Sequence, residues 1–104
     1  MFQIYTPAKS ESYWDGYTDA VDLVVFDDFH GDRQLRVMLP FLDGQMMRLS
    51  QRYSSYVKRK NVPIIVMSNF SPETVYRFPN RILEEAFVTR FTVIELDSFI
   101  NIFQ

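Results

Sequence analysis

The sequence predicts an α/β fold built around a mainly parallel sheet. Two apolar runs, residues 21–29 and 62–67, are rich in β-branched side chains. Runs of this kind are typical of strands that are buried on both faces of a parallel sheet. Between them, apolar residues recur at helical spacing from Arg33 onward, which indicates helical structure beside the strands.

The composition predicts one small globular domain over residues 1–104. Of the 104 residues, 47% are hydrophobic and 23% are charged, which allows a single core. The absence of cysteine excludes disulfides and thiolate zinc sites. A net charge of −2 gives no overall attraction to nucleic acid, so such binding would need a local basic patch. No apolar stretch reaches the roughly 18 residues of a membrane span, and we expect no signal peptide.

In the first half of the chain, we expect a short strand at residues 2–5, a loop to Thr18, and the strand at residues 21–29. The helical spacing then continues from Arg33 to about Tyr53. Pro40 and Gly44 interrupt it, so the pattern favours two helices with a joint near residues 41–44.

In the second half, a basic stretch at residues 57–60 precedes the strand at residues 62–67. Residues 71–73 read as a helix start, because Pro72 suits the first helical position. A short helix is predicted from Pro79 to Phe87, and residues 91–96 read as a last strand.

Polar side chains follow both of the predicted buried strands. Asp27 and Asp28 end the first, and Ser68 and Asn69 end the second. The carboxyl ends of strands in an open α/β sheet face the crevice that binds ligands, which predicts one site at one sheet edge. Adjacent buried carboxylates are costly without a cation or hydrogen-bond donors. The alternatives are two acids that cap a turn and an asparagine that bonds within its own turn.

Five segments, in this order, resemble the superfamily 3 helicase domain of replication-associated (Rep) proteins of circular single-stranded DNA viruses. They begin with an aromatic YWDGY segment at residues 13–17 and a Walker B run at residues 24–31 that ends in DDFHG. An LSQRY segment follows at residues 49–53, and a motif C strand at residues 64–72 ends in SNFSP. The last is a late segment with an arginine at residues 85–91. The resemblance runs from Tyr13 to about Leu96. It implies an AAA+-like three-layer core with a mainly parallel sheet, truncated at its N-terminal side.

The resemblance also implies roles for individual residues. Asp27 would hold Mg²⁺ through water, Asp28 would polarise the attacking water, and Asn69 would be the sensor that contacts the γ-phosphate or that water. Arg90 would be the arginine finger that reaches a neighbouring subunit's nucleotide, with Arg77 and Arg81 as competitors. Another grouping, His30 with Asp32, matches no standard metal-site spacing.

The basic cluster Lys58, Arg59 and Lys60 would contact the phosphate backbone of DNA in a central channel. In the family, a β-hairpin between the LSQRY segment and motif C carries a lysine that meets DNA. That part of this chain is shorter than usual, which predicts a stunted hairpin. A solvated loop is the alternative reading of the cluster.

The phosphate-binding pattern G-x-x-x-x-G-K-[ST] is absent, and none of the three glycines fits it. The metal-binding histidine pair and catalytic tyrosine of the family's rolling-circle endonuclease domain are also missing. We therefore expect no ATP turnover by this chain alone. The resemblance otherwise implies Mg²⁺ and ATP as cofactors, single-stranded DNA as partner, a hexameric ring in the intact protein and no membrane partner.

Two functions follow as hypotheses. The first is the distal part of a rolling-circle ATPase that couples ATP hydrolysis to translocation on single-stranded DNA. The second is a non-catalytic oligomerisation or DNA-binding module derived from such a helicase. A coincidental α/β domain with a magnesium-dependent phosphotransfer site is a third reading. A viral Rep would act in the host nucleus, and otherwise we expect an intracellular protein that is not secreted.

Overall fold

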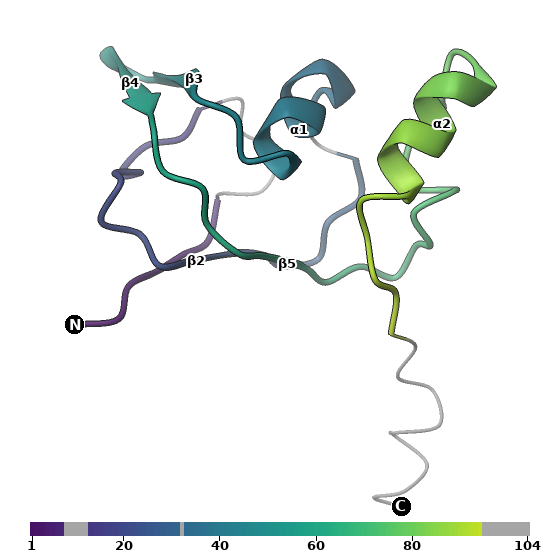
Figure 1. The fold of residues 1–104 in the computed structure, drawn as a ribbon, viewed down its shortest axis with the longest axis horizontal. Coiled ribbons are helices and arrows are strands. Elements are labelled where there is room, and N and C mark those ends of the chain that lie inside the picture. The colour runs from purple at the N-terminus through teal and green to yellow at the C-terminus, as the bar shows by residue number, and fades with distance from the viewer. Residues whose placement is uncertain (8–12, 32, 95–104) are drawn as a thin grey trace, which may run out of the picture.

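The computed structural model describes residues 1–7, 13–31 and 33–94. Three strands form a parallel sheet in the order β1-β2-β5, with Tyr5 opposite Val24 and Val24 opposite Ile64. Their bounds are Ile4–Tyr5, Leu23–Phe26 and Ile64–Val66. The helices α1 (Leu35–Leu42) and α2 (Arg81–Val88) lie on one side of this sheet, together with a hairpin of β3 (Met47–Gln51) and β4 (Ser54–Lys58) (Figure 1). The predicted α/β class with a parallel sheet is confirmed.

The core lies between the sheet and α1. Val24 and Phe26 of β2 are buried, whereas the alternate residues Leu23 and Val25 face the other side and are half-buried. The ring of Phe41 in α1 stacks on Trp14, with centroids 4.5 Å apart and an interplanar angle of 20°. The Phe41 ring also meets the Phe26 ring of β2 edge to face, with centroids 6.1 Å apart, so aromatic contacts link the helix to the sheet.

The prediction of a second helix up to Tyr53 is wrong, because β3 and β4 form an antiparallel hairpin there. Gln51 pairs with Ser54, and Arg52 and Tyr53 form the turn. A helix would have buried Met46, Leu49 and Tyr53 on one face. Instead Met46 is 69% exposed and Tyr53 is 99% exposed, and only Leu49 enters the core. The hairpin thus begins earlier in the chain than the resemblance implied, and its strands have five residues each.

Long-range hydrogen bonds explain why this segment is not helical. The Asp15 carboxylate accepts the backbone N–H of Arg52 at 2.8 Å, and the Ser50 carbonyl accepts the N–H of Trp14 at 2.8 Å. The first helix ends at Leu42, as Pro40 and Gly44 predicted. Gly44 has φ of 73°, and a Cβ there would lie 2.1 Å from Oδ1 of Asn61.

Two smaller predictions are also wrong. Residues 71–73 form a turn instead of a helix start, with the Ser71 carbonyl accepting the N–H of Thr74 at 3.0 Å. Residues 91–94 form no strand, and the remainder of that predicted strand, 95–96, lies outside the described residues. The helix predicted at 79–87 is confirmed as α2. Its N-cap is Asn80, whose side chain accepts the N–H of Leu83 at 2.9 Å.

Candidate functional site

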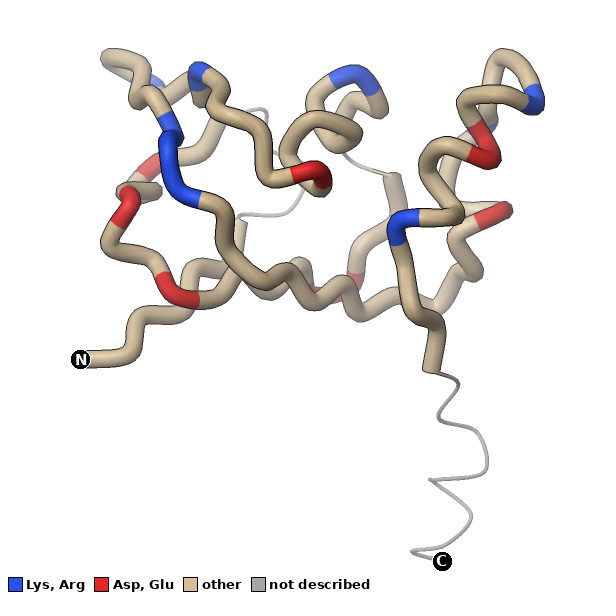
Figure 2. Tube along the Cα trace, in the orientation of Figure 1, with Lys and Arg blue, Asp and Glu red and all other residues tan. Residues whose placement is uncertain are grey.

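The acid pair lies where β2 ends (Figure 2 shows the acidic and basic positions along the chain). Asp27 and Asp28 are both exposed, while the next residue, Phe29, is buried and anchors the turn. Asp28 has φ of 53°, a left-handed conformation that is uncommon for residues other than glycine. Such backbone conformations cost free energy and are enriched at functional sites.

Hydrogen bonds join the end of β2 to the end of β5. The N–H of Met67 donates to the Phe26 carbonyl at 2.8 Å, and the N–H of Phe29 donates to the Met67 carbonyl at 2.8 Å. The Ser68 hydroxyl also donates to the Phe29 carbonyl. The acid pair and the exposed Asn69 therefore lie at the same sheet edge, which we call the acid edge (Asp27, Asp28, Ser68 and Asn69).

The acid edge does not contain a complete metal site made of protein side chains among the described residues. Within residues 1–7, 13–31 and 33–94, no three His, Cys, Asp or Glu side chains are grouped to hold a metal ion. Mg²⁺ usually keeps several waters and binds through one or two carboxylates together with substrate phosphates. Exposed carboxylates at Asp27 and Asp28 could provide that kind of contact. Asp32, the partner considered for His30, lies outside the described residues.

The Arg90 side chain is committed to a contact within the chain. Its Nε lies 2.6 Å from Oδ1 of Asp43, and its second terminal nitrogen lies 2.8 Å from Oδ2. A further terminal nitrogen donates to the Ala86 carbonyl. The hydrogen bond from Arg90 lowers the pKa of the Asp43 carboxyl and raises the pKa of the guanidinium. This bidentate pair connects the ends of α1 and α2.

The other candidate arginines have different surroundings. Arg81 is exposed and forms an ion pair with Glu85 one turn further along α2, at 3.7 Å. Arg77 is exposed and precedes α2.

The basic cluster is divided between the core and the surface. Lys58 is only 1% exposed, and its Nζ donates to the Gln45 carbonyl at 3.3 Å beside the Phe41 ring. Burial lowers the pKa of its ammonium group. Arg59 and Lys60 are exposed. These two residues are therefore the exposed part of the cluster, and Nζ of Lys60 lies 3.8 Å from Oδ1 of Asp22.

A carboxylate that sequence reasoning missed holds the basic loop in place. Asp19 accepts the backbone N–H groups of Arg59 and Lys60, each at 3.1 Å, and the Tyr56 hydroxyl at 3.3 Å. Burial alone would raise the pKa of Asp19, but these hydrogen bonds together lower it. Because about forty residues separate Asp19 from the loop, no local pattern could have signalled this contact.

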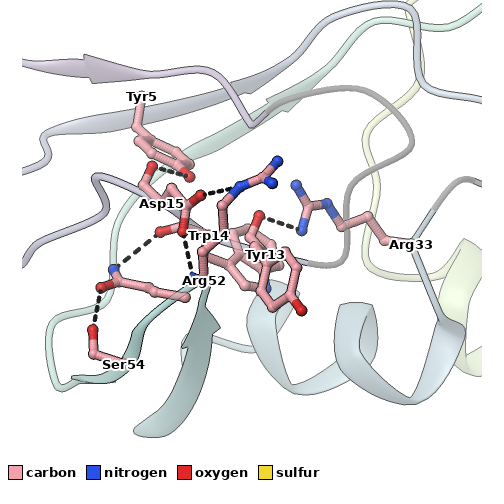
Figure 3. Close-up of polar contacts among 8 residues, drawn as sticks. Tyr5, Tyr13, Trp14, Asp15, Arg33, Arg52 and Ser54 are labelled. Atoms are coloured by element: carbon pink, nitrogen blue, oxygen red, sulfur yellow. Dashed lines mark hydrogen bonds and ion pairs between the residues drawn. The ribbon is translucent and has the colours of Figure 1, made fainter.

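The aromatic segment at residues 13–17 connects several elements (Figure 3). Asp15 forms an ion pair with Arg52 at 2.9 Å, and its carbonyl accepts the Tyr5 hydroxyl at 3.0 Å. The Arg33 guanidinium donates to the Tyr13 carbonyl at 3.1 Å and lies 4.2 Å from the Trp14 ring centroid. This segment, one of the five on which the resemblance rests, is therefore a structural connection between β1, α1 and the hairpin.

Comparison with known proteins agrees with a Rep-like relationship. No protein-family model matches the chain. The chain is 39% identical over 72 residues to the replication-associated protein of beak and feather disease virus, which covers 62% of this chain and 22% of that protein. The chain thus spans less than a quarter of that relative's length. None of the described helices is long and apolar enough to cross a membrane.

Proposed function

We propose that this chain is a replication module equivalent to the distal part of a superfamily 3 helicase core. In this proposal the parallel sheet belongs to an AAA+-like core, and the acid edge serves an ATP site. Asp27 holds Mg²⁺ through water, Asp28 polarises the attacking water, and Asn69 senses the γ-phosphate. The observation that supports it most is the hydrogen bonding between the ends of β2 and β5, because it brings both polar strand ends to one edge.

The nucleotide site of this proposal needs a phosphate-binding loop that the sequence does not contain. The chain alone should therefore not turn over ATP. Arg90 would act as a finger only in an assembled ring, where its guanidinium would exchange Asp43 for a neighbour's nucleotide. Arg59 and Lys60 would contact single-stranded DNA from the surface of the loop after β4.

A chimera tests the ATPase proposal. The chain replaces the matching region of the replication-associated protein of beak and feather disease virus, and magnesium-dependent ATP hydrolysis is measured. We expect Asp28→Asn to abolish hydrolysis by the chimera, whereas Glu73→Gln, at an exposed carboxylate in the turn after β5, leaves it nearly unchanged. A folded, assembled chimera without hydrolysis, or with hydrolysis that survives Asp28→Asn, would contradict the proposal.

A second candidate function is non-catalytic self-assembly, and it is favoured by the sheet face that the described residues leave uncovered. Alternation along β1 and β5 turns Ile4, Ile65 and Met67 away from the helices, and they are 59%, 48% and 48% exposed. Parallel sheets normally have both faces covered. Sedimentation velocity should detect dimers or larger assemblies that Ile65→Asp disrupts, while Ile82→Asp on the outer face of α2 has no effect. A strictly monomeric wild-type chain would remove this candidate.

A further inference from the structure

A cavity of about 750 Å³ opens between α1 and α2, which lie side by side above the sheet in Figure 1. Small-molecule sites commonly have volumes of roughly 300–1,000 Å³. Leu35 and Leu39 of α1 form one apolar wall, and Leu83 of α2 contributes to another. The charged residues among the described lining are all arginines, Arg33, Arg36 and Arg77.

Two of these arginines have guanidinium groups that are available to a ligand. Arg36 and Arg77 are exposed, and neither has a carboxylate partner among the residues that the structure describes. Within the part of the chain that the structure describes, Arg36 donates to the neutral side chain of Gln34, at 2.6 Å. By contrast, Arg90, beyond the cavity, forms an ion pair with Asp43. The cavity therefore carries local positive charge on a chain whose net charge is −2.

The walls of the cavity are held in position. The Tyr76 hydroxyl donates to the Arg33 carbonyl, and the Tyr76 ring packs against Phe87 of α2 with centroids 5.2 Å apart. Gly31 lies so close to this segment that an added Cβ would be 2.4 Å from the Val75 carbonyl oxygen. A preformed site loses less conformational entropy when it binds a ligand.

We propose that this cavity binds a nucleotide unit of single-stranded nucleic acid. The phosphate would lie between Arg36 and Arg77, whose planar guanidinium groups suit phosphate oxygens, and the sugar or base would contact the leucine walls. Single-strand sites combine positive charge with apolar surface in this way. A free mononucleotide has the same chemistry. The preference for a strand rests on the proposed replication role, but the site involves neither the acid edge nor the loop at Arg59 and Lys60.

Fluorescence anisotropy with a labelled short oligothymidylate tests the cavity. We expect the Arg36→Ala/Arg77→Ala variant to bind at least about tenfold more weakly than wild type. The slope of log affinity against log salt should fall in magnitude by about 0.7, because the two arginines together neutralise one phosphate and each neutralised phosphate contributes ~0.7. The control variant Arg48→Ala/Arg81→Ala removes the same charge from exposed positions outside the cavity, and its affinity should stay within about twofold of wild type. An unchanged melting temperature checks that both variants fold.

Three outcomes would overturn the cavity site. Equal losses of affinity in the two double variants would mean that only net charge matters. A loss confined to Arg59→Ala/Lys60→Ala would assign the strand to the loop and leave the proposed replication role intact. In the third outcome, thymidine monophosphate displaces a labelled mononucleotide, but Arg36→Ala/Arg77→Ala does not change the affinity for the oligothymidylate. That result would assign the cavity to free nucleotides. ATP hydrolysis by the chimera is measured in a separate assay. A failure of the proposed ATPase function can therefore be told apart from each of these three outcomes of the cavity test.

Discussion

Substitutions of Lys58 test whether this residue is buried in the core, as the structure shows, or exposed to DNA, as the basic run predicts. In the structure its four methylene groups are packed in the core, and its Nζ makes one hydrogen bond to the Gln45 carbonyl. Burying an ammonium group costs several kcal/mol, which a charged hydrogen bond of about 1.5–3 kcal/mol and a cation–π contact of about 0.5–1 kcal/mol largely offset. Methionine keeps most of the packing without the charge.

We therefore expect Lys58→Met to change the free energy of unfolding by less than about 1 kcal/mol. Lys58→Ala should lower it by roughly 2–3 kcal/mol, because it removes about three buried methylene groups at ~0.8 kcal/mol each. Urea denaturation measures both values. If Lys58 were instead solvated and faced DNA, both substitutions would leave the free energy of unfolding nearly unchanged. Each would then weaken the binding of oligothymidylate. That result would refute the buried position.

The pH dependence gives a second readout of the same position. Because burial lowers the pKa of Lys58, the folded state releases this proton more readily than the unfolded state, whose lysine pKa is about 10.4. The cost of the buried charge is fully present below the folded pKa and disappears as pH rises toward the unfolded value. The stability of wild type relative to Lys58→Met should therefore increase between neutral pH and about 10. Burial raises the pKa of Tyr17 to about 12, but both proteins share that residue.

Three further sets of substitutions test other parts of the structure. Gly31→Ala should lower the free energy of unfolding by about 2–4 kcal/mol in urea titrations, because φ is 77° and the Val75 carbonyl leaves no room for a Cβ. Gly16→Ala should lower it by only about 1–2 kcal/mol through backbone strain, because no atom lies within 4 Å of a Cβ there. Asp28→Asn should be nearly neutral and Asp28→Val should cost about 1–2 kcal/mol, since φ is 53°; equal effects would contradict the left-handed turn. A double-mutant cycle with Arg90→Ala and Asp43→Asn should give a coupling energy of about 1 kcal/mol that is present above pH ~4 and disappears as pH falls through the depressed pKa of Asp43. A cycle with no coupling at neutral pH would show that the ion pair is absent in solution.

Local sequence patterns predicted the structure correctly where the interactions that decide it are made between residues close together in the chain. The apolar runs before Asp27 and Ser68 predicted two strands of the sheet, but the burial of both faces that they also predicted is wrong over the described residues, because Ile65 is 48% exposed. Pro40 and Gly44 predicted where α1 ends, through the conformations that these residues impose. The polar residues after both strands predicted a shared edge, because parallel strands end on the same side of a sheet.

Tertiary contacts decided what those patterns left open. The helical spacing of Met46, Leu49 and Tyr53 was overridden by Asp15, whose carboxylate holds the hairpin turn from 37 residues away. Arg90 meets Asp43 across 47 residues. Sequence alone determined the strands β2 and β5 and the helix α2, because propensity and capping act within a few residues. Only the folded chain determined which charged side chains remain exposed, because burial depends on surfaces that distant segments bring together.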